Sequence, residues 1–100
     1  MGINWGNYVY ETHPLTTTLE SYLNQNERKT YLDIAMEQGN RILEIGFGSA
    51  LGLIYLIMNN REVVGLDRER RVIALAKQRM RLFKVKCSLV LADADRKSVV

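Results

Sequence analysis

The stretch that decides the fold is RILEIGFGSALG, residues 41–52. It begins with a short apolar run, and similar runs recur at Glu62–Leu66 and Cys87–Leu91. Apolar residues on both faces of such runs are typical of buried strands in a parallel sheet. The glycines after Ile45 predict a tight turn from the first strand into a helix.

Helical stretches separate the three runs. Residues from Ala50 to Met58 are almost all apolar, as expected of a helix packed deep against a sheet. From Asp67 to Leu82 an apolar stripe at helical spacing lies opposite arginines and lysines, which predicts an amphipathic outer helix. The stripe consists of Val72, Ala76, Met80 and Phe83. The alternation predicts an α/β fold, the N-terminal half of a Rossmann-like doubly wound parallel sheet with right-handed crossovers and strand order 3-2-1.

The residues before this pattern predict one or two helices. Asn26 is a candidate N-cap for a helix through about Gln38, with Gly39 as its stop. Its expected packing face is Tyr31, Ile34, Ala35 and Gln38. A shorter helix is expected around Leu19–Leu23. We therefore divide the chain into an N-terminal arm with helices, residues 1–38, and a βαβαβ half-domain, residues 39–100, which lacks the later strands of a complete domain.

Composition narrows the class of protein. The chain has 100 residues, of which 47% are hydrophobic and 25% charged, close to average globular usage. Its single cysteine, Cys87, cannot form an internal disulfide, and no Cys/His spacing indicates a metal site. No apolar window of about 18 residues and no signal peptide are found. We expect a cytoplasmic protein with no membrane partner, in which Cys87 is a core residue.

Three strand ends carry residues suited to binding a small molecule. Gly46 and Gly48 follow the first strand and let a ligand approach the main chain closely. Asp67 ends the second strand and Asp93 follows the third. Because parallel strands end at the same edge of a sheet, these groups are expected to face one crevice. A carboxylate at Asp67 suits a ribose diol.

Across roughly Gly39–Asp95 the chain resembles class I S-adenosylmethionine-dependent methyltransferases, whose first motif is an acidic residue followed by glycine, any residue, glycine. The resemblance implies S-adenosyl-L-methionine as cofactor. It implies that Glu44 anchors the turn and reaches toward the methionine ammonium. The main chain at Gly46 and Gly48 would lie alongside the amino-acid and ribose portions of the cofactor.

The resemblance also assigns the other two strand ends. Asp67 would hold both ribose hydroxyls, and Arg68 would lie beside the adenine ring. Asp93 would accept a hydrogen bond from the adenine amino group, and the backbone N–H of Ala94 would donate to a ring nitrogen. One departure concerns the helix start: Ala50 stands where many members have a third glycine, and Gly52 falls later.

Two other functions stay open. A nicotinamide-dinucleotide fold also uses a glycine-rich first turn, but its G-x-G-x-x-G pattern would need glycine where Leu51 stands. A non-catalytic cofactor-binding or interaction module is the main alternative. Nothing after Asp95 resembles an acceptor-site motif, so the methyl acceptor and the catalytic residues are unknown, and we expect the isolated chain to transfer no methyl group.

Charge and strand order bear on partners. Eight basic residues crowd between Arg68 and Lys86. We interpret them as a solvated helix face, with nucleic-acid contact as a less favoured alternative. Strand order 3-2-1 leaves Arg41–Ile45 at an open apolar edge and one sheet face bare. We therefore expect a homo-oligomer, or a longer chain or partner that completes the sheet.

Overall fold

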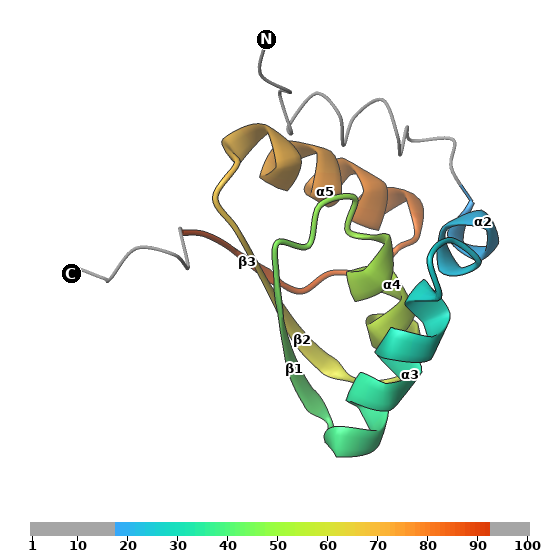
Figure 1. The fold of residues 1–100 in the computed structure, drawn as a ribbon. Coiled ribbons are helices and arrows are strands. Elements are labelled where there is room, and N and C mark those ends of the chain that lie inside the picture. The colour runs from blue at the N-terminus through green and yellow to red at the C-terminus, as the bar shows by residue number, and fades with distance from the viewer. Residues whose placement is uncertain (1–17, 93–100) are drawn as a thin grey trace, which may run out of the picture.

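A computed structural model describes residues 18–92 of the chain. Asp93 and Ala94, the expected adenine contacts, lie outside the described residues, as does the aromatic arm before residue 18. The described elements follow one another along the chain (Figure 1). They are α2 (Leu19–Leu23), α3 (Arg28–Gln38), β1 (Arg41–Ile45), α4 (Leu51–Met58), β2 (Glu62–Asp67), α5 (Arg70–Leu82) and β3 (Ser88–Leu91).

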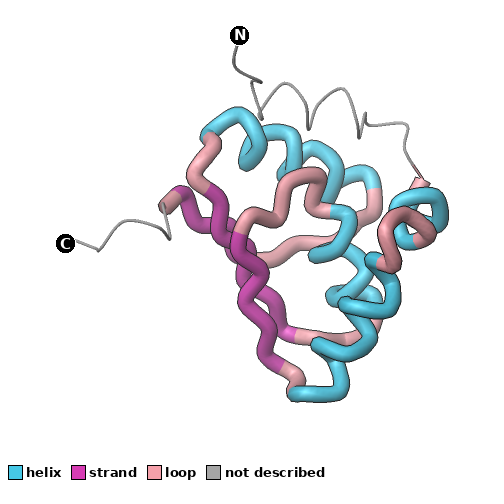
Figure 2. The backbone as a smooth tube through the Cα atoms, viewed as in Figure 1, coloured by secondary structure: helices cyan, strands magenta, loops and turns pink. Residues whose placement is uncertain are grey.

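The three strands form one parallel sheet in the order β1-β2-β3 (Figure 2). The register places Glu44 opposite Gly65, and Gly65 opposite Leu89. The α/β class and the expected strand order are therefore confirmed, with the middle strand one residue longer than expected and the third starting one residue later.

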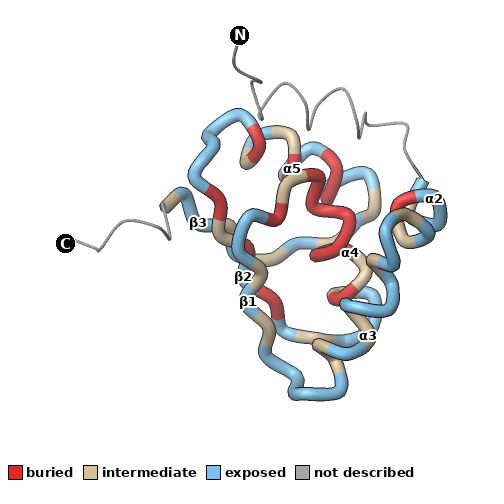
Figure 3. Tube along the Cα trace, viewed as in Figure 1, coloured by how far each residue is buried: buried red, intermediate tan, exposed pale blue. Residues whose placement is uncertain are grey.

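Helices α4 and α5 pack against one face of this sheet, and α2 and α3 pack on α4. Buried residues gather on α4, as Figure 3 shows, and the expected deep helix is confirmed. Gly65 makes the close approach possible, because a Cβ there would lie 2.7 Å from Cδ1 of Leu53 and 2.8 Å from Cδ2 of Phe47. The core cluster comprises Phe47, Ala50, Leu53, Leu56, Val63, Val72 and Ala76. The Val72, Ala76 and Met80 part of the expected α5 stripe is buried.

Helix α3 corrects two expectations. Tyr31 and Ile34, expected to pack inward, are exposed, and Leu32 and Met36 contact the core instead. The helix has two apolar rows, and the one that meets α4 and the sheet decides the packing. The expected N-cap is also wrong, because Glu27 precedes the first helical residue in a left-handed conformation and makes no side-chain cap bond.

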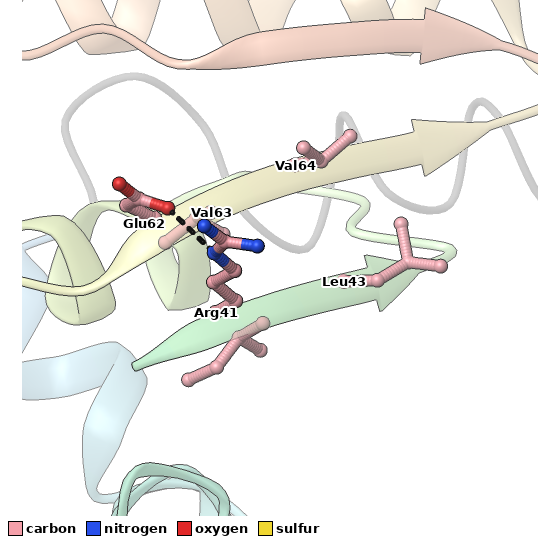
Figure 4. Close-up of a pocket in the computed structure, with 6 residues that line it drawn as sticks. Arg41, Leu43, Glu62, Val63 and Val64 are labelled. Atoms are coloured by element: carbon pink, nitrogen blue, oxygen red, sulfur yellow. Dashed lines mark hydrogen bonds and ion pairs between the residues drawn. The ribbon is translucent and has the colours of Figure 1, made fainter. Parts of the chain in front are cut away.

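The second face of the sheet is bare among the described residues. Leu43 and Ile45 of β1 are 56% and 59% exposed, and Val64 and Val90 continue the apolar surface across β2 and β3. Figure 4 shows a hollow on this face, with an ion pair of 3.2 Å between Arg41 and Glu62 at its end. Parallel sheets are normally covered on both faces. This face therefore leaves a large apolar surface in contact with water.

No helix within residues 18–92 has the length and apolar composition needed to cross a lipid bilayer.

The bare face predicts self-association of the purified chain, because covering apolar surface is favourable by about 25 cal/mol per Å². Light scattering after size exclusion should show species larger than a monomer. Leu43→Lys/Val64→Lys should shift the distribution toward monomer. The control is Tyr31→Lys/Ile34→Lys, which adds the same charge on exposed apolar positions of α3 and should change little. A wild-type chain that is a stable, cooperatively unfolding monomer would contradict the prediction.

Candidate functional site at the strand ends

The loop from β1 to α4 has an unusual backbone. Gly46, Gly48 and Ala50 have φ values of 69°, 53° and 66°. Glycine adopts this left-handed region freely, whereas an L-residue there costs about 1 kcal/mol or more. Ala50 caps α4, which begins at Leu51. Ala50, which stands where the motif often has a third glycine, therefore adopts a strained left-handed conformation. Its side chain is fully buried in the core cluster.

Asp67 ties this loop to the next strand end. One carboxylate oxygen of Asp67 accepts a hydrogen bond from the Gly48 N–H at 3.3 Å. The other oxygen accepts from the Glu69 N–H at 3.0 Å. The structure therefore brings together two of the predicted residues, Gly48 and Asp67, and fixes the carboxylate above the strand ends. Arg68 lies next to it in the turn before α5, with its side chain exposed.

Glu44 lies on the helix-covered face of β1, against α4 and α2. A Cβ on Gly52 would lie 3.1 Å from both the Oε1 of Glu44 and the hydroxyl of Tyr22. The late glycine of the motif thus makes room for these two polar groups. The Oε2 atom of Glu44 is buried and has no hydrogen-bond partner within residues 18–92. Burial raises the pKa of Glu44 from 4.5 to about 7, and the charge of Arg28 opposes the rise.

Helix α2 supplies a neighbour for Glu44 that the sequence analysis missed. Thr18 caps this short helix by accepting from the Ser21 N–H at 3.0 Å. Tyr22 is buried, and its hydroxyl accepts a hydrogen bond from Arg28 at 3.3 Å. The Arg28 guanidinium also lies 4.7 Å from the centre of the Tyr22 ring. Burial and the nearby Glu44 raise the pKa of Tyr22, so its hydroxyl keeps its proton.

The sequence signal for Tyr22 was its apolar spacing with Leu19 and Leu23. That spacing marks an inward-facing side chain but carries no information about Glu44, which is distant along the chain. The contact depends on how α2 packs on α4, and this is a property of the tertiary structure.

Arg79 corrects the expectation that every basic residue of the run lies on the outer face. It is 0% exposed and lies in the buried stripe of α5. Its guanidinium donates a hydrogen bond to the backbone carbonyl of Ser49, inside the glycine loop. Position 79 falls on the inward side because it is three residues after Ala76. A positive charge therefore holds the loop from its core side. Burial lowers the pKa of Arg79.

Cys87 behaves as the expected core residue. It packs against both buried clusters, and burial raises the pKa of its thiol. The neutral thiol is a poor nucleophile.

No protein-family model matches the chain, and no curated protein matches its sequence. The fold is similar to a solved structure, the PH0226 protein from Pyrococcus horikoshii OT3, with a TM-score of 0.73 and 19% sequence identity. The match covers 98% of this chain and 43% of that one. The chain thus spans less than half the length of this structural neighbour, and the likeness establishes the α/β fold.

Glu44 predicts how stability depends on pH. Its pKa is about 7 in the folded chain, against an ordinary value of 4.5, so the folded state holds this proton more tightly than the unfolded chain does. The free energy of unfolding should therefore fall as the pH rises from about 4.5 to about 7. Glu44→Gln should remove this fall and be more stable than the wild type at about pH 8, by up to about 3 kcal/mol.

Denaturant titrations at several pH values measure the effect. Glu37→Gln is the control, because Glu37 is an exposed carboxylate on α3 and should leave the pH profile unchanged. Equal profiles for the wild type and Glu44→Gln would show that Glu44 ionises normally in the folded chain.

Proposed function

We propose that the chain is the S-adenosyl-L-methionine-binding portion of a class I methyltransferase. The observation that carries the proposal is Glu44. A buried carboxylate with an unpartnered oxygen is costly to ionise, and a ligand that brings a positive charge would offset that cost. The α-ammonium of the methionine moiety is a group of this kind. The proposal names the cofactor and no methyl acceptor.

The glycine loop supports the same assignment. Gly46 and Gly48 have no side chains that could fill the space above the strand ends, and no atom of residues 18–92 lies within 4 Å of a Cβ built on Gly46. A ligand can therefore approach the main chain at Gly46. The left-handed φ of this residue makes any substitution strained.

Asp67 would accept from the ribose hydroxyls in this proposal. Its two hydrogen bonds from backbone N–H groups orient the carboxylate, and each oxygen has a further lone pair available. A carboxylate held in place before binding loses little conformational entropy when a ligand arrives. Asp93 and Ala94 remain the proposed adenine contacts, with Arg68 beside the ring.

A dinucleotide ligand suits the loop less well. Binding a pyrophosphate requires free backbone N–H groups in the glycine loop that leads into the helix. The Gly48 N–H is already directed at the carboxylate of Asp67, and the Ala50 N–H donates to the carbonyl of Phe47 at 3.0 Å. The carboxylate of Asp67 would also repel a nearby phosphate. A cofactor-binding module without catalysis shares every feature of the proposed site and differs only in activity.

Calorimetric titration with S-adenosylhomocysteine tests the proposal. The wild-type chain should bind, and Asp67→Ala should weaken binding roughly ten- to a hundredfold, since a charge-assisted hydrogen bond contributes about 1.5–3 kcal/mol. Glu69→Ala is the control, because its exposed side chain makes no cap bond. For an analogue without the ribose hydroxyls, the wild-type chain and Asp67→Ala should bind with the same affinity.

Absence of binding by the folded wild-type chain would exclude the cofactor. If Asp67→Ala weakened the binding of S-adenosylhomocysteine and of the analogue equally, Asp67 would act only by holding the loop.

A further inference from the structure

Charge is unevenly distributed along the described part of the chain. Residues 70–92 contain no aspartate or glutamate, and their basic residues are Arg70, Arg71, Lys77, Arg79, Arg81, Lys84 and Lys86. Residues 18–40 have the opposite balance, with Glu20, Glu27, Asp33 and Glu37 against Arg28 and Lys29. The net charge of +3 therefore understates the positive charge around α5. All of the cations of residues 70–92 except the buried Arg79 are exposed, so the surface at and just after α5 is rich in positive charge.

Three of these cations form one row on α5. At 3.6 residues per turn, Arg70, Lys77 and Arg81 fall within roughly 40° of one another around the helix axis. All three are exposed, on the side opposite the buried Val72 and Ala76. In Figure 3 the trace of α5 alternates between buried and exposed residues, the exposed ones in pale blue. Lys84, just beyond the helix, is also exposed, so the basic row extends over about 20 Å.

No acidic side chain of the described residues neutralises this row. The ion pairs within residues 18–92 join Lys29 to Asp33 and Arg41 to Glu62, both away from α5. Arg70, Lys77 and Arg81 make no side-chain hydrogen bond or ion pair to any residue in that range. A solvated helix face commonly mixes charges of both signs. This row has one sign only, which is the pattern of a phosphate-binding surface.

We propose that the row of Arg70, Lys77 and Arg81, extended by Lys84, binds the phosphate backbone of a nucleic acid. The row spans about the length of six base-pair steps of B-DNA at 3.4 Å each. Binding through phosphates positions a nucleic acid without reading its sequence. The row begins three residues after Asp67, which lies at the end of β2. A nucleic acid bound along α5 would therefore pass beside the ends of the parallel β-strands. The inference is independent of which small molecule binds there.

Fluorescence anisotropy with a labelled single-stranded oligouridylate RNA and a labelled DNA duplex tests the proposal over about 25–200 mM KCl. Three to four phosphate contacts predict a slope of log K against log salt of about −2 to −3.5. Lys77→Gln/Arg81→Gln should weaken binding at low salt at least about tenfold and reduce the slope by about 1.5–2. These substitutions change only exposed side chains.

The matched control is Lys29→Gln/Arg41→Gln, which lowers the net charge by the same two units on exposed residues outside α5. It should leave affinity and slope nearly unchanged. Binding of RNA or of DNA supports the proposal, and the tighter of the two identifies the source of the phosphates. The proposal is overturned by no binding at the lowest salt, by equal losses in both variants, or by binding only to phosphatidylserine vesicles.

Discussion

The carboxylate of Asp67 is the constraint on which the site depends. Its two oxygens accept from the N–H groups of Gly48 and Glu69, so one side chain joins the β1–α4 loop to the β2–α5 turn. A hydrogen bond to a charged group contributes about 1.5–3 kcal/mol, and of these two bonds the one from Glu69, at 3.0 Å, is the shorter. A contribution of this size is enough to offset the cost of about 1–2 kcal/mol for the left-handed backbone of Ala50. The loop can therefore keep an open conformation above the strand ends without a ligand to hold it.

Two buried charges flank this loop, and they are satisfied to different extents. Arg79 reaches from α5 to the carbonyl of Ser49 and so stabilises the loop from the core side. Glu44 lies beside Tyr22, and its Oε2 has no hydrogen-bond partner among residues 18–92. Burying a charge costs free energy, and hydrogen bonds to the charged group reduce that cost. Arg79 belongs to the scaffold because its guanidinium holds the loop carbonyl of Ser49. The contrast is why the proposed function rests on Glu44.

The sequence predicted the sheet well because its signals are local. Strand β1 has the predicted bounds, since a short apolar run between a helix stop and a glycine turn allows few alternatives. The packing of α3 was predicted wrongly because its apolar rows are equivalent until α4 and the sheet select one. Arg79 was misplaced because a charged residue is assumed to face water, whereas its side chain is long enough to reach a buried carbonyl. The roles of Tyr22 and Arg28 needed the docking of α2, which no local pattern encodes.

The bare face of the sheet bears on the site as well as on association. Ile45, 59% exposed on that face, directly precedes Gly46, so the loop is supported by Asp67 and Arg79 on one side of the sheet and by nothing described on the other. Parallel sheets are stable when both faces are covered, and the structural neighbour carries more than twice this length of chain. A segment or partner that covered Leu43 and Ile45 would restrict the end of β1, and with it the position of Glu44 and the glycine loop in the proposed site.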